Sequence, residues 1–176
     1  MKPFSVITFL LLSLLSISGC FFSKLQKTEP QTEVAQSYLM PSSDMNDTLL
    51  LYKRTPCFGA CPTFTMVVKM NGEVTYFGRQ NVEMLGNYTA TWDANRLKQL
   101  DDQMQSVQFY RLPLSFDNPQ VTDLPSTYIG YTEGNNLHTV KCRYQTPQNL
   151  KDLAAWLDEE IKQTTWNQNN SNNNHE

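Results

Sequence analysis

The chain lacks the patterns that identify most enzymes and most nucleic-acid-binding proteins. Its 176 residues include only two histidines, and no Ser/His/Asp, Cys/His or paired-carboxylate arrangement stands out. A glycine-rich phosphate-binding loop is absent as well. The lysines and arginines form no cluster, and the formal net charge is −3. This balance argues against nucleic acid as a partner, and we expect no catalytic residues, no metal and no cofactor.

Long apolar runs are also scarce, and the one at the N-terminus is too short to cross a bilayer as a helix. A basic start precedes about 14 apolar residues that end at Ile17, so residues 1–19 are predicted to be a signal peptide. Ile17-Ser18-Gly19-Cys20 resembles the lipobox of bacterial lipoproteins, whose cysteine is acylated and becomes the mature N-terminus. The resemblance implies a lipid on Cys20, such as palmitate, that anchors the protein to a membrane. Ordinary secretion and an uncleaved anchor are the alternatives.

Composition divides the rest of the chain into three parts. Residues 20–47 join the lipidated cysteine to a polar, weakly periodic stretch that is typical of a flexible tether. Residues 48–166 have the length of one domain. Residues 167–176 are rich in asparagine and are predicted to be a disordered tail.

The predicted domain begins with a strand at residues 48–54 and a hairpin around Asn71-Gly72. A three-residue loop with Gly72 in the left-handed region would set Val68 opposite Val74 and Met66 opposite Tyr76. This register gathers apolar side chains on one face, whereas a two-residue loop would mix polar and apolar residues. We therefore expect the bulged hairpin.

Further elements follow in regular order. A fourth strand at residues 86–92 precedes an amphipathic helix capped by Asp93. A long proline-containing connection, residues 109–126, leads to a second hairpin around Gly134-Asn135. A last helix follows Thr146 as N-cap. The order β-β-β-β-α-β-β-α predicts an α+β fold, with a mostly antiparallel sheet of about six strands and two amphipathic helices on one face.

Two acidic runs lie on the predicted helices. Asp101-Asp102 and Asp158-Glu159-Glu160 are interpreted as solvated helix faces. The second run lies near a helix C-terminus, where negative charge opposes the helix dipole, so this end is expected to fray.

Two segments of the predicted domain carry a family resemblance. The segments 54–64 (RTPCFGACPTF) and 71–78 (NGEVTYFG) resemble an uncharacterised family of bacterial envelope proteins, the domain-of-unknown-function family numbered 6438. Its members are often lipoproteins of Bacteroidota, and the CFGxCP segment is its most specific part. In that phylum, surface-exported lipoproteins carry acidic residues soon after the lipid cysteine. Residues 21–25 have none, which implies an outer-membrane protein facing the periplasm, a compartment that tolerates disulfides.

Apart from Cys20, three cysteines remain, and three pairings among them are open. Cys57–Cys61 is the expected disulfide, because a turn brings Cα atoms four residues apart within bonding range. Cys142 is interpreted as a small buried hydrophobe.

A redox or copper-handling function for Cys57 and Cys61 is the main alternative. Cys-x-x-x-Cys-Pro resembles the copper-chaperone motif of thioredoxin-fold assembly proteins, in which a helix N-terminus lowers the thiol pKa. Here the motif leads into a predicted strand. A zinc or copper site that also uses His138 and Cys142 is restricted, because these two residues lie about 13 Å apart along a strand.

Binding by shape is the third hypothesis. The loop tip, Phe58-Gly59, together with Phe109, Tyr110 and Phe116 of the long connection, would present a rigid apolar patch to an envelope protein or a glycan. Core packing of these aromatic residues is the alternative. We therefore predict a lipid-anchored, non-enzymatic binding domain.

Overall fold

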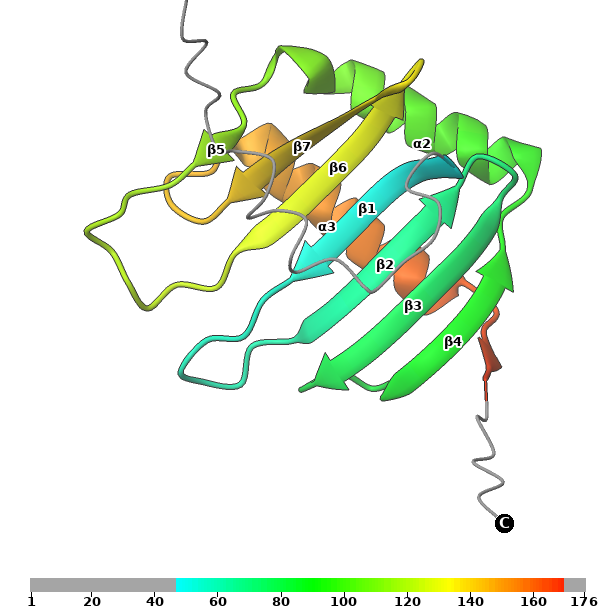
Figure 1. Cartoon of the computed structure of the whole chain (residues 1–176), viewed down its shortest axis with the longest axis horizontal. Helices are drawn as coiled ribbons and strands as arrows, with labels where there is room; N and C mark the ends of the chain where they lie inside the picture. The colour runs from blue at the N-terminus through cyan, green and yellow to red at the C-terminus, as the bar shows by residue number, and fades with distance from the viewer. Residues whose placement is uncertain (1–46, 170–176) are drawn as a thin grey trace, which may run out of the picture. The chain divides into compact units, whose positions relative to one another are not determined.

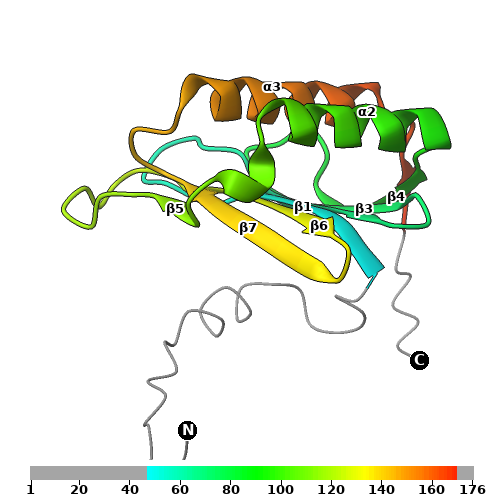
Figure 2. The ribbon, with the colours of Figure 1, turned by 90° about the horizontal axis from the view of Figure 1, so that it is seen from above.

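A computed structural model describes residues 47–169, which form an open eight-stranded sheet with two α-helices on one face (Figures 1 and 2). The strand order is β5-β7-β6-β1-β2-β3-β4-β8. All neighbours are antiparallel except β5 and β7. The strands are β1 (Thr48–Arg54), β2 (Thr63–Lys69), β3 (Glu73–Gln80), β4 (Gly86–Thr91), β5 (Ser115–Phe116), β6 (Thr127–Glu133), β7 (Asn136–Cys142) and β8 (Asn167–Gln168). The helices are α2 (Ala94–Ser106), the short 3₁₀ helix η2 (Phe109–Arg111) and α3 (Gln148–Gln163).

The predicted α+β class is confirmed, and two details of the prediction are wrong. The sheet has eight strands where about six were expected, because β5 and β8 each add a two-residue strand. The order is therefore β-β-β-β-α-β-β-β-α-β in place of β-β-β-β-α-β-β-α. The first residues of the predicted tail belong to the sheet, since β8 pairs with β4. The rest of that tail, the predicted signal peptide and most of the predicted tether lie outside the described residues.

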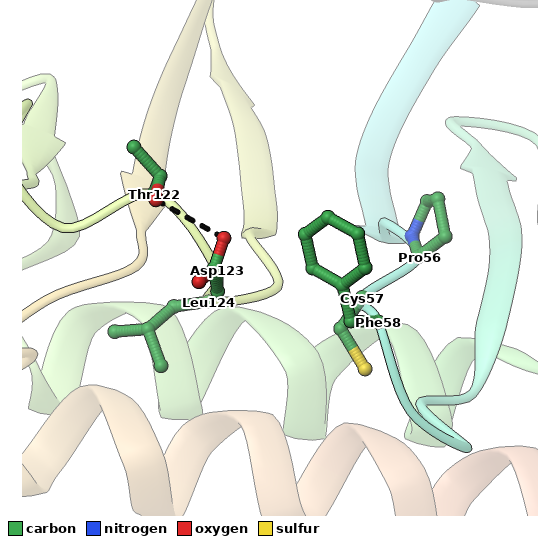
Figure 3. Close-up of a pocket in the computed structure, with 6 residues that line it drawn as sticks. All are labelled: Pro56, Cys57, Phe58, Thr122, Asp123 and Leu124. Atoms are coloured by element: carbon green, nitrogen blue, oxygen red, sulfur yellow. Dashed lines mark hydrogen bonds between the residues drawn. The ribbon is translucent and has the colours of Figure 1, made fainter.

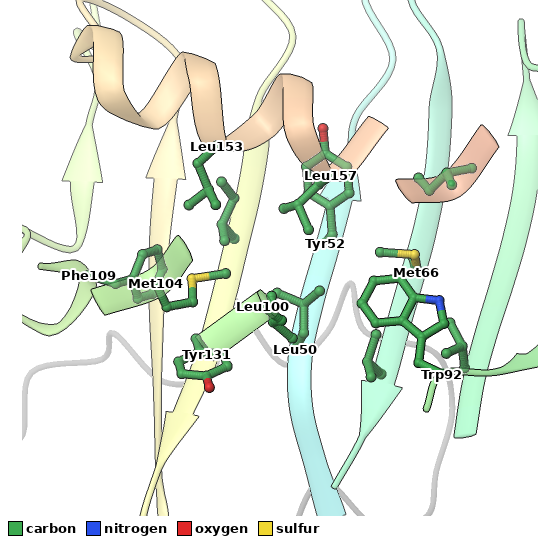
Figure 4. Packing of buried hydrophobic residues seen from close by; sticks show 14 of the residues in the cluster. Leu50, Tyr52, Met66, Trp92, Leu100, Met104, Phe109, Tyr131, Leu153 and Leu157 are labelled. Carbon is green, nitrogen blue, oxygen red and sulfur yellow. The ribbon is translucent and has the colours of Figure 1, made fainter. Parts of the chain in front are cut away.

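The bulged register of the first hairpin is confirmed. Met66 lies opposite Tyr76 and Val68 opposite Val74, and Gly72 has φ of 85°. The apolar face that results packs against both helices, with Trp92 near Met66 and with Leu100 near Leu50 (Figure 4). The fully buried side chains include Leu50, Tyr52, Met66, Leu100, Met104, Phe109, Leu153 and Leu157.

The N-terminus of α3 differs from the prediction, and side chains bond to its C-terminus. The helix begins at Gln148 with Pro147, not Thr146, as its N-cap residue, because Pro147 keeps an extended ψ of 151°. At the C-terminal end, two side chains donate hydrogen bonds to carbonyl oxygens of the last turn. Thr164 Oγ1 donates to the Glu160 carbonyl oxygen (2.7 Å), and Trp166 Nε1 donates to that of Ile161 (2.8 Å). These bonds satisfy carbonyls that a helix C-terminus otherwise leaves unpaired.

The acidic runs are not simply solvated faces. Asp158 accepts hydrogen bonds from Tyr52 and Arg54. Glu160 is buried, with its Oε2 2.9 Å from Arg96 Nε, although the N–H is not aligned as in a hydrogen bond. Asp101 accepts from the Tyr131 hydroxyl at 3.1 Å. Three of these five carboxylates therefore tie the helices to their surroundings.

Candidate functional site

The disulfide loop, residues 55–62, connects β1 to β2. Cys57 and Cys61 form the expected disulfide, with their Cα atoms 5.7 Å apart. The Gly59 N–H lies 3.2 Å from Cys57 Sγ inside the ring. A ring of five residues closed by a covalent bond leaves little conformational freedom at the loop tip.

Hydrogen bonds hold the disulfide loop from both sides. Thr55 pairs with Ser126 twice: its N–H donates to the Ser126 carbonyl oxygen (3.0 Å), and its Oγ1 accepts from the Ser126 N–H (2.8 Å). On the other side, Asn81 Nδ2 donates to the Cys61 carbonyl oxygen at 3.1 Å. The loop is therefore fixed to the long connection before β6 and to the turn after β3.

The five residues of the predicted interaction surface do not come together as one patch. Phe58 is 93% exposed, and Gly59 is exposed beside it. Phe109 is 0% exposed, whereas Tyr110 and Phe116 are partly buried and pack against the core. The long connection folds back through η2 and β5, so core packing accounts for these three aromatic residues.

A different residue joins Phe58 in the structure. Leu124, which is 42% exposed, lies across a shallow pocket of about 210 Å³ from the disulfide loop. Figure 3 shows the Phe58 ring between Pro56 and the Thr122–Leu124 segment. Thr122 Oγ1 and Asp123 Oδ1 are 3.0 Å apart and hydrogen-bonded. No sequence pattern marks Leu124, because it enters the site only through the Thr55–Ser126 pairing.

The remaining cysteine and the strand histidine have local roles. Cys142 is a free, buried thiol, and burial raises its pKa to about 11, so it is protonated at neutral pH. His138 Nε2 lies 3.1 Å from the Leu112 carbonyl oxygen, to which it donates, and its ring packs edge-on against Phe109. Between residues 47 and 169, no group of three or more His, Cys, Asp or Glu side chains is arranged to hold a metal ion.

The disulfide loop also lacks the setting of a reactive cysteine pair. Cys61 is followed by Pro62 and then directly by β2, so no helix N-terminus follows the motif to lower a thiol pKa. The pair is in the disulfide form, which offers no thiolate to a metal ion.

Arg54, the last residue of β1, lies directly before the disulfide loop and was not among the predicted site residues. Its Nε donates to the Tyr52 hydroxyl oxygen (3.0 Å), its Nη2 pairs with Asp158, and its guanidinium carbon lies 5.9 Å from the Phe64 ring centroid. The sequence pattern indicates this position, because alternation along β1 places Arg54 on the same face as buried Leu50 and Tyr52. A cation on a core-facing strand position requires a carboxylate partner.

Comparison with known proteins identifies the family. Searches of the curated proteins and of the solved structures found no match. Among the described residues, no helix is long and apolar enough to span a membrane. The family model of the domain of unknown function DUF6438 matches residues 48–161, which is most of the described part. The chain therefore belongs to the DUF6438 family.

Proposed function

We propose that this protein is a non-enzymatic binding domain of the bacterial cell envelope. A lipid on Cys20 anchors it, and the tip of its disulfide loop docks a partner protein. The observation that carries the proposal is the 93% exposure of Phe58 on a covalently closed ring. An exposed phenylalanine on a rigid loop loses little conformational freedom on binding, and its burial is favourable by about 2–3 kcal/mol.

A protein is favoured over a glycan as the partner. Phe58 and Leu124 are large, exposed apolar side chains that line the pocket. The polar pair Thr122 and Asp123 is already hydrogen-bonded internally. A sugar needs free hydrogen-bonding groups around its ring, whereas an apolar side chain of a protein is complementary to this rim.

The test is crosslinking in cells of the full chain and of its Phe58→Ser variant. We expect the variant to lose its crosslinked partner, with binding weakened about tenfold or more, because the buried ring is lost. Its thermal unfolding should match that of the parent, since the ring contacts almost nothing. Met70→Ser is the matched control, because Met70 is 45% exposed and lies at the other end of the sheet. Equal crosslinking by all three proteins would refute the docking role.

Two further measurements address the anchor and the alternative chemistry. Cys20→Ser should abolish acyl labelling and release the protein from membranes; an unchanged membrane fraction would contradict lipid anchoring. The Cys57–Cys61 disulfide should stay oxidised when the native protein is incubated with glutathione, and thiol titration measures this. A readily cycling pair, or copper retained through gel filtration, would favour the thiol–disulfide or copper-handling alternative instead.

A further inference from the structure

A second pocket, of about 290 Å³, lies on the other side of the Thr55–Ser126 pairing. β1, β6, β7 and the first turns of α3 contribute to its wall. Three cationic side chains line it, and none of the described residues in its lining is acidic. The cations are Arg54, Arg143 and Lys151. The whole chain has a formal net charge of −3, so the positive charge at this pocket is a property of the pocket and not of the overall composition.

Arg54 is held rigidly at the wall of this pocket. Its Nε–H donates to the Tyr52 hydroxyl oxygen, and one Nη2–H donates to Asp158. The rings of Tyr52 and Phe64 lie beneath the guanidinium carbon. A guanidinium has five N–H donors. Three donors therefore remain on a side chain that is already oriented, which lowers the entropy lost when a ligand binds.

Arg143 carries charge that its neighbours do not fully compensate. Its side chain is 16% exposed, and its Nε lies 3.4 Å from Asp117 Oδ1 without a hydrogen bond. Asp117 also pairs with Lys141 at 2.6 Å, so two cations share one carboxylate. The charge of Arg143 is therefore only partly compensated by Asp117.

The rest of the wall favours an anion as well. Lys151 is exposed and has no ion-pair partner among the described residues. Thr127 and Thr146 add hydroxyl donors, and the Cys142 thiol, protonated at neutral pH, brings no negative charge. The cations at or beside the wall are Arg54, Arg143, Lys141 and Lys151. The first three share only two carboxylates, Asp117 and Asp158.

We propose that this pocket binds the oxyanion of a small solute, a carboxylate or a phosphate group. Its volume lies just below the roughly 300–1,000 Å³ of most ligand pockets, which restricts the ligand to a small molecule. Bidentate recognition of carboxylate and phosphate is the characteristic chemistry of arginine. Phe58 does not line this pocket, so the proposal is independent of the docking role of the disulfide loop.

The test is titration of the ¹⁵N-labelled full chain, purified in a non-ionic detergent and a chloride buffer, with inorganic phosphate and with succinate. We expect saturable shifts of the amide signals of Thr127 and Arg143 with at least one of the two anions. The Lys151→Gln variant should bind about tenfold more weakly, because a hydrogen bond to a charged group is lost. The matched control is Lys162→Gln, which makes the same charge change at the other end of α3.

The outcomes separate clearly. A weakened Lys151→Gln variant beside an unchanged Lys162→Gln variant supports the site, and the anion that binds identifies the group recognised. Equal weakening of the two variants would reduce the effect to net charge and overturn the proposal. The proposal would also be overturned if neither anion produced a saturable shift.

Discussion

The two ends of the sheet are built in opposite ways. At the turn end, short connections join β2 to β3 and β6 to β7, and β4 leads directly into Trp92 and α2. At the loop end lie the disulfide loop, the long connection before β6 and the segment between β7 and α3. Both pockets described above are at the loop end.

The turn end contributes mainly to the stability of the sheet, whereas the loop end carries the candidate functional residues. Backbone contacts fill the turn end: the Trp92 N–H donates to the Gly72 carbonyl oxygen at 2.8 Å, and a side chain at Gly72 would collide with the Trp92 carbonyl oxygen. The loop end instead places side chains at the surface, with Phe58 in solvent and three cations around a pocket. We therefore expect substitution of Gly72 to destabilise the domain, and substitutions of the exposed side chains at the loop end to alter mainly its surface.

The largest effect is expected at Gly72. Gly72→Ala should lower the free energy of unfolding by about 3 kcal/mol, because left-handed strain adds to the clash with Trp92. Chemical denaturation measures the loss. Gly134→Ala is the control, since Gly134 also has positive φ but has open space around it, and it should cost about 1 kcal/mol. Equal losses in the two variants would show that the clash with Trp92 adds nothing to the strain of a positive φ.

A smaller effect is expected at the disulfide. The double variant Cys57→Ser, Cys61→Ser should lose about 2 kcal/mol, the chain-entropy value for a five-residue ring. Its far-UV circular dichroism spectrum should stay unchanged, because the core residues lie elsewhere. Loss of the folded spectrum would mean that the loop end also supports the fold, and the proposed contrast would fail.

The smallest effect is expected at Asp117 and depends on pH. The hydrogen bond from Lys141 is the main cause that holds the pKa of Asp117 below its ordinary value, and the charges of Lys141 and Arg143 also contribute. A carboxyl with a depressed folded pKa adds stability above its unfolded pKa and loses it as pH falls through the folded value. Asp117→Asn should therefore cost about 1.5 kcal/mol at pH 7.

The difference between this variant and the parent should disappear as the pH falls below the ordinary aspartate range. Thermal unfolding between pH 7 and pH 2.5 measures it. A difference that persists at the lowest pH would assign the effect of Asp117 to packing and not to its charge.

The turn end was largely predictable from the sequence. Asn71-Gly72 gives a local turn signal, and the demand for one apolar face selects the register that pairs Met66 with Tyr76. Asp93 caps α2 as expected, because an N-cap depends only on residues within one turn of it.

The loop end was less predictable, because its geometry comes from distant segments. β5 and β8 are two residues long and have no periodicity, so only their pairing with β7 and β4 defines them. Arg54, Arg143 and Lys151 are separated by up to about a hundred residues in the chain, so they form no basic cluster in the sequence. The Cys57–Cys61 disulfide was predictable because its spacing alone brings the two cysteines within reach.

The central position of β1 has a mechanical consequence. The chain enters the sheet at Thr48, and from Leu50 to Arg54 β1 is paired with β2 on one side and with β6 on the other. A force applied along the strand through residue 48 would have to shear both ladders at once, whereas a force on an edge strand would open one ladder bond by bond. If the preceding segment tethers the domain to a membrane, tension from a bound partner acts on a strand that is held by a neighbour on each side.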